Sequence, residues 1–61
     1  MNNKQRTLAY IKAHPGHTAR TLAIALGVRR EDSMKLRESE KEGLIWWDDK
    51  LNGWVKTEAT N

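Results

Sequence analysis

The basic side chains are the residues of this sequence whose type and placement could support binding chemistry. Residues 1–30 carry six bases and no acid, a net charge of +6. Residues 31–61 carry five bases and eight acids, a net charge of −3, so the halves sum to the +3 of the whole chain. A one-sided positive field attracts polyanions such as nucleic acid, although an unevenly charged solvated surface gives the same composition. The bases of the first half are Lys4, Arg6, Lys12, Arg20, Arg29 and Arg30.

Catalytic and metal-binding chemistry has little support in the sequence. It contains no cysteine, and its two histidines, His14 and His17, flank a Pro-Gly turn without a third ligand nearby. No nucleophile with an adjacent base, no phosphate-binding glycine loop and no pair of acids can be recognised. We therefore expect no enzymatic activity, no metal and no cofactor. We expect His17 instead to supply backbone to a short strand beside a hairpin.

The length of the chain limits it to one small domain, which we expect to span residues 1–61. A chain of this size buries only about 60% of its unfolded surface, so each large apolar residue matters for stability. No apolar run approaches the ~18 residues of a membrane span, and no signal peptide opens the chain. With the lack of cysteine, these features predict a soluble cytoplasmic protein without a membrane partner.

Three helices are predicted, over residues 4–14, 18–26 and about 30–42. The first has apolar residues at helical spacing and ends before Pro15. The second has Thr18 as its N-cap, an apolar stripe along one face, and Gly27 where a left-handed C-cap is needed. The third is rich in charge and has Leu36 as its one clear apolar anchor.

A β-hairpin is predicted over residues 44–57. Asn52-Gly53 is a two-residue turn signal that would pair Leu51 with Trp54, whereas a wider loop would pair Trp47 with Trp54. Because the two registers have the same parity, both place the same side chains on each face. We expect Trp47 and Trp54 in the core and Trp46 partly exposed. One face would hold Ile45, Trp47 and Trp54, and the other Leu44, Trp46 and Val55.

This order of elements resembles the winged helix-turn-helix DNA-binding domains of bacterial and phage regulators, over about residues 4–57. Residues 18–28, TARTLAIALGV, are similar to the family's second helix and turn, and residues 40–45, EKEGLI, to the exit from its recognition helix into the wing. The resemblance implies an α+β fold, mostly α, with a three-helix core and a C-terminal hairpin wing. The chain departs from the family where Ser33 or Ser39 stands for a buried aliphatic residue. This departure predicts a third helix that is short, shifted or loosely packed.

The resemblance also implies contacts in the major groove of DNA. Arg29 and Arg30 stand where the family's recognition helix enters the groove, with a solvated helix start as the alternative. Met34, Lys35 and Glu38 are expected on its outward face, touching a thymine methyl, a phosphate and a cytosine amine respectively. Met34 could equally belong to the core.

Phosphate contacts are expected from the second helix, because its start crosses the DNA backbone in this family. Thr18 and Arg20 would make them, although Thr18 could act only as a cap. The other candidates for DNA contact are Lys4 and Arg6 in the first helix and Lys50 and Asn52 in the wing. Lys50 and Asn52 lie at the wing tip, where a plain hairpin turn is the alternative.

These features predict a protein that binds double-stranded DNA, in the manner of a small transcriptional regulator of bacterial or phage type. The acids of the third helix leave two alternatives open. One is a protein-interaction module, with a second copy or another protein docked on Trp46 and the wing. The other is an accessory component of a phage or plasmid nucleoprotein complex.

Overall fold

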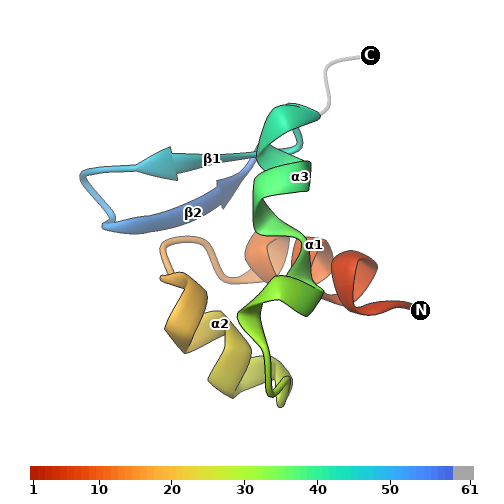
Figure 1. The fold of residues 1–61 in the computed structure, drawn as a ribbon. Helices are drawn as coiled ribbons and strands as arrows, with labels where there is room; N and C mark the ends of the chain where they lie inside the picture. The colour runs from red at the N-terminus through yellow and green to blue at the C-terminus, as the bar shows by residue number, and fades with distance from the viewer. Residues whose placement is uncertain (59–61) are drawn as a thin grey trace.

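The computed structural model describes residues 1–58 and has an α+β fold in which about half of the chain is helical. In Figure 1 the hairpin lies beside α3, with α1 behind and α2 below. The predicted α+β class, with helices followed by a C-terminal hairpin, is confirmed. None of the helices over residues 1–58 is long and apolar enough to cross a membrane. The elements are α1 (Asn3–Ala13), α2 (Ala19–Leu26), the 3-10 helix η1 (Glu31–Met34), α3 (Leu36–Lys41), β1 (Ile45–Asp48) and β2 (Gly53–Lys56).

A capping box starts α1. The Asn2 side chain accepts a hydrogen bond from the Gln5 amide at 2.8 Å, and the Gln5 side chain accepts one from the Asn2 amide at 3.4 Å. The inner face of the helix buries Thr7 and Ile11, which lie four positions apart. The Thr7 hydroxyl donates to the Asn3 carbonyl at 2.6 Å, so this buried polar group is satisfied within the helix. The predicted bounds differ from the observed ones by one residue at each end.

The second helix, α2, begins and ends as the sequence predicts. Thr18 accepts a hydrogen bond from the Thr21 amide at 3.3 Å, and Gly27 closes the helix with a φ of +70°. The Val28 amide then donates to the Ala23 carbonyl at 3.0 Å, which returns the chain toward the core. The N-cap and the left-handed C-cap are both confirmed.

The predicted continuous helix over residues 30–42 is wrong. The segment consists of η1 and α3, which are separated by Lys35 in the left-handed conformation, with φ 58° and ψ 39°. The reason lies in the core, because Met34 is 0% exposed and Leu36 only 9%. Residues two positions apart in a continuous helix point about 200° apart, so both could not face one core. The left-handed residue between them turns both side chains inward.

The third helix is short, as predicted from the serine that stands where a buried aliphatic residue is usual. Ser39 occupies the second buried position of α3, with 1% of its surface exposed. Among the described residues its hydroxyl has no hydrogen-bond partner. A hydroxyl in this setting packs weakly and loses its water, so α3 has a single strong apolar anchor, Leu36.

The hairpin adopts the wider of the two predicted registers. Trp47 pairs with Trp54 and Asp48 with Gly53, so the two-residue turn at Asn52-Gly53 is wrong. The Asp48 side chain accepts hydrogen bonds from the amides of residues 50 and 51, at 2.8 and 3.3 Å. These bonds stabilise a four-residue loop in place of the tighter turn. Asn52 supplies the left-handed residue of the loop, with φ 55°.

A close backbone contact fixes the hairpin to the loop between α1 and α2. The Trp54 amide donates to the His17 carbonyl, and the Gly16 amide donates to the Trp54 carbonyl, both at 2.9 Å. A side chain at Gly53 would lie 2.2 Å from the backbone of Gly16, so only glycine fits there. The predicted short strand at His17 is confirmed as this single bridge.

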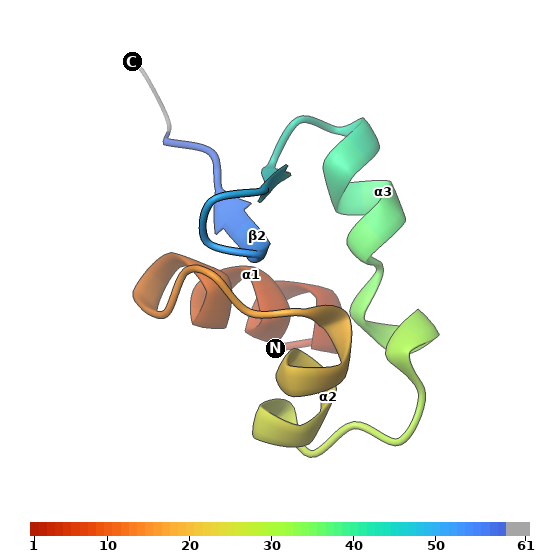
Figure 2. The same cartoon turned by 90° about the vertical axis from the view of Figure 1, so that its left-hand side faces the viewer.

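The core lies where the three helices meet β1. Figure 2 shows the hairpin above α1, with α3 to its right and α2 below. Leu8, Leu26 and Trp54 pack around the edge of this core. The buried apolar residues are Ile11, Leu22, Ala23, Met34, Leu36 and Ile45.

Candidate nucleic-acid interface

Lys4 and the acids of the third helix form the ion pairs of the described chain. Lys4 Nζ lies 3.1 Å from a Glu38 carboxylate oxygen, and it also donates a hydrogen bond to Glu42. These bonds, first to Glu42 and then to Glu38, raise the pKa of Lys4 above its ordinary value. Lys4 thus joins the start of α1 to α3 and draws both carboxylates toward α1. The structure places Lys4 and Glu38, both predicted to contact DNA, against each other.

Arg6 supports the end of α2. Its guanidinium donates to the Leu26 carbonyl at 2.8 Å and to the Asn3 side chain at 3.1 Å. The last carbonyls of a helix lack partners within the helix and carry partial negative charge, so a cation stabilises them. Arg6 therefore has a structural role in the fold, whereas the sequence suggested a phosphate contact.

The prediction that Met34 touches a base is wrong. Its side chain is completely buried in the core, at 0% exposure. The physical reason is the break at Lys35, which rotates Met34 inward beside Leu36. Met34 therefore takes the alternative that the sequence left open, a place in the core.

Arg29 and Arg30 lie in the turn between α2 and η1, and both are exposed. The backbone carbonyl of Arg30 accepts bonds from the amide and the hydroxyl of Ser33, at 3.1 and 2.8 Å. Within residues 1–58 neither guanidinium forms an ion pair. Both side chains are therefore available to an external anion.

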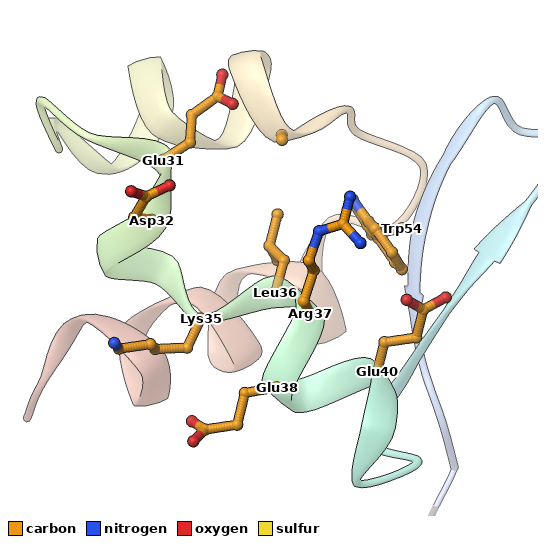
Figure 3. Close-up of a pocket in the computed structure, with 9 residues that line it drawn as sticks. Glu31, Asp32, Lys35, Leu36, Arg37, Glu38, Glu40 and Trp54 are labelled. Carbon is orange, nitrogen blue, oxygen red and sulfur yellow. The ribbon is translucent and has the colours of Figure 1, made fainter.

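A groove of about 560 Å³ separates the start of α2 from η1 and α3. Its apolar floor comes from Ala19, Leu36 and Trp54. In Figure 3 the Arg37 side chain extends from α3 toward the Trp54 ring, while Glu38 points away from it. The charged residues along the groove are Glu31, Asp32, Lys35, Arg37, Glu38 and Glu40.

Arg37 is a base of this groove that the sequence reasoning missed. A helix that begins at residue 36 and buries Leu36 and Ser39 directs residue 37 outward. The signal was present in the 36/39 spacing. The prediction placed residues 34, 35 and 38 on the outward face and did not use the buried pair Leu36 and Ser39. Lys35, which was among those, is exposed at the break itself.

The start of α2 brings Thr18 and Arg20 to the same end of the groove as Ala19. The Thr18 hydroxyl is engaged in the cap, where it lies 3.1 Å from the hydroxyl of Thr21 and 3.3 Å from its amide. Arg20 is exposed. Of the two predicted residues, Arg20 is the one whose side chain remains available to a ligand.

At the tip of the hairpin Lys50 and Asn52 have different roles. Lys50 is exposed, and its side chain has no ion pair within the described residues. Asn52 is the left-handed residue of the loop, so the conformation of the hairpin accounts for its presence. The Asp48 carboxylate, which could repel a phosphate, is bound to amides of the loop.

The three tryptophans lie on the two faces of the hairpin. Trp47 and Trp54 share the face toward the core and meet edge to face, with ring centroids 5.4 Å apart and planes at 82°. Trp54 packs on the core, but Trp47 is 38% exposed, so its prediction as a core residue is wrong. It lies near the loop end of a short hairpin, with Trp54 as its cross-strand partner. Trp46, on the opposite face, is 46% exposed, as predicted.

The structure thus divides the predicted residues into two sets. The fold uses six of them: Lys4, Arg6, Thr18, Met34, Glu38 and Asn52. The other five present cations without an ion pair over residues 1–58: Arg20, Arg29, Arg30, Lys35 and Lys50.

Comparison of the chain with protein-family models, with curated proteins and with solved structures finds no match. What the protein does is therefore inferred from the surfaces described above.

Proposed function

We propose that the protein binds double-stranded DNA as a winged helix-turn-helix module. The order of three helices and a hairpin, with a glycine turn after α2, supports this proposal. So does the basic first half of the chain, which carries a net charge of +6 over residues 1–30 from six bases and no acid.

One observation carries the proposal, and it concerns which charges are already paired. Within residues 1–58 the ion pairs are those of Lys4 with Glu38 and Glu42. The carboxylates of Glu38 in α3 and of Glu42 at its C-cap are thereby neutralised by a cation of α1. The guanidinium groups around α2 and α3 keep their donors for an external anion. These groups belong to Arg20, Arg29, Arg30 and Arg37.

Phosphate contacts provide most of the affinity in this proposal. The six-residue α3 is only about 9 Å long, and Glu31, Asp32 and Glu40 line the groove beside it. A helix this short, with acids beside it, offers few donors for base edges. We therefore expect strong salt dependence and modest discrimination between sequences.

Fluorescence anisotropy with a labelled duplex tests the proposal. The variant Arg29→Gln/Arg30→Gln removes two unpaired cations, and Lys12→Gln/Lys56→Gln is a matched control with the same net charge. We expect the arginine variant to bind about tenfold more weakly and to lower the slope of log K against log salt by about 1.8, the value for two phosphates. The lysine control should bind like the wild type.

Equal weakening of both variants would mean that net charge alone drives binding, and would remove the proposed surface. Absence of binding at low salt would remove the function itself.

Selection from a random duplex library separates two roles within this function. A single enriched sequence would suit a small transcriptional regulator. Binding without enrichment would suit an accessory component that coats or bends DNA in a larger complex.

A further inference from the structure

The outward face of α2 presents a large apolar side chain to solvent. Leu22 and Ala23 are buried, so the helix packs on the core by the side that carries them. Ile24 lies on the other side, and 74% of its surface is exposed. Among the described residues, Met1 is the one large apolar residue that is more exposed. The core therefore gains little from Ile24.

The charged side chain next to Ile24 on α2 is a cation. Arg20 precedes Ile24 by four positions, which places the two side chains about 40° apart around the helix axis and about 6 Å apart along it. Arg20 is exposed and forms no ion pair within residues 1–58. The Gly27 amide donates to the Ile24 carbonyl at 3.2 Å, where the turn that leads to Arg29 and Arg30 begins. The helix itself contains no acid.

Glu31 and Asp32, the acids closest to α2 in sequence, line a different part of the surface. They stand along the groove between α2 and α3, to which α2 contributes Ala19. Ala19 and Ile24 are five positions apart, which is about 140° around the helix axis. Ile24 is therefore directed away from the side of α2 that borders the groove and its carboxylates.

An exposed aliphatic side chain beside a cation fits one feature of duplex DNA. The C5-methyl of thymine is the apolar group that base pairs present in the major groove, and the phosphates border this groove. An arginine four positions from Ile24 can contact a phosphate while the isoleucine lies against a methyl group. The charge complementarity between this face and the phosphate backbone favours DNA as its occupant.

The major groove suits α2 better than α3. The helix has eight residues and no acid, whereas α3 has six residues and follows an acidic 3-10 helix. A helix with its side chains is about 10–12 Å wide, which matches the major groove at about 12 Å and exceeds the minor groove at about 6 Å. The thymine contact that the sequence assigned to Met34 is impossible because Met34 is buried, whereas Ile24 is exposed.

We propose that Ile24 contacts thymine methyl groups in the major groove and gives the protein a preference for A·T pairs. The inference rests on the proposed DNA binding, and it adds a base contact to the phosphate contacts described above. It differs from the family resemblance, in which the third helix reads the bases.

Removal of the thymine methyl is the direct test. Fluorescence anisotropy compares a short labelled duplex of A·T pairs with its copy in which deoxyuridine replaces every thymidine. We expect the wild type to bind the deoxyuridine duplex about fourfold more weakly, the loss for one methyl group that is no longer buried. Ile24→Ala should bind the two duplexes equally. Ile24→Val keeps a branched side chain and should retain most of the preference.

Methylated cytosine provides a second readout on the same variants. In a duplex of G·C pairs, 5-methylcytosine places a methyl group in the major groove where thymine has one. The wild type should bind the methylated duplex about fourfold more tightly than the unmethylated one. Ile24→Ala should not distinguish them.

Equal binding of the two A·T duplexes by the wild type would overturn the proposal and leave the proposed DNA binding intact. A preference that persists in Ile24→Ala would overturn it by assigning the methyl contact to another residue. Equal weakening of Ile24→Ala on thymidine and deoxyuridine duplexes would assign Ile24 to another contact, such as a wedge between base pairs in the minor groove. Absence of binding to every duplex would remove the inference and the proposed function together.

Discussion

Gly27 and Lys35 both adopt the left-handed conformation, Gly27 before the turn that leads into η1 and Lys35 directly after η1. The two residues adopt it for opposite reasons. Gly27 ends α2 with φ 70°, a conformation that glycine adopts without steric cost. Lys35 adopts φ 58° at a cost of roughly 1 kcal/mol, because its neighbours Met34 and Leu36 both enter the core. A local signal in the sequence sets the first turn, whereas tertiary packing imposes the second.

The largest expected effect comes from removing the packing that imposes the break. Met34→Ala should lower the free energy of unfolding by about 2–5 kcal/mol, because Met34 is fully buried. Urea denaturation followed by circular dichroism measures this loss. Ile24→Ala is the control, since Ile24 is 74% exposed and should change stability little. A mild effect at Met34 would contradict the account of the break.

Gly27→Ala tests the turn that the sequence specifies. No atom lies within 4 Å of the position that a Cβ would occupy, so strain at φ 70° is the main cost. We expect a loss of about 1 kcal/mol, measured as a lower midpoint in the same urea experiment. A neutral result would mean that the turn does not need glycine.

A substitution at Lys35, the left-handed residue after η1, should raise the free energy of unfolding, whereas Gly27→Ala lowers it. Lys35→Gly relieves the left-handed strain, and the added freedom of the unfolded chain offsets part of that gain. We expect a net gain of roughly 0.5 kcal/mol in the free energy of unfolding. Lys35→Ala keeps a Cβ and serves as control, because it should show no gain. A destabilised glycine variant would argue that Lys35 itself contributes a contact.

The smallest effect concerns the ion pairs that hold α3 to α1. The pKa of Lys4 is raised in the folded protein, so its contribution to stability is complete below the ordinary lysine pKa of about 10.4 and is lost as pH rises through the higher folded value. Thermal denaturation of wild type and Lys4→Gln should therefore differ slightly at neutral pH and converge above that range. High salt should also reduce the difference. An undiminished difference at high pH would contradict the pairing.

Local signals predicted the first half of the fold well. The Thr18 cap, the α2 stripe and the Gly27 turn involve residues within a few positions of one another, so propensity and capping rules suffice. The sequence also predicted which side chains share a face of the hairpin, because this depends only on their alternation along each strand. It could not predict the register, since the register depends on hydrogen bonds from the loop amides to Asp48.

The candidate site was predicted less well than the fold. Lys4 and Arg6 contact partners that are distant in sequence, Glu42 and Leu26, which no local pattern reveals. The break at Lys35 moved Met34 into the core, because two core residues compete for one face of a helix. Arg37 points outward because Leu36 and Ser39 occupy the inner face of α3. Arg29 and Arg30 follow the Gly27 turn, and their exposure agrees with the prediction.

Heteronuclear NMR with a short random-sequence duplex at low salt tests the central claim most directly. The account predicts amide shifts at Arg20 and over residues 29–37, with Lys12 and Trp46 unmoved. Absence of shifts, or shifts confined to Trp46 and Val55 of the hairpin, would contradict DNA binding by the surface around α2.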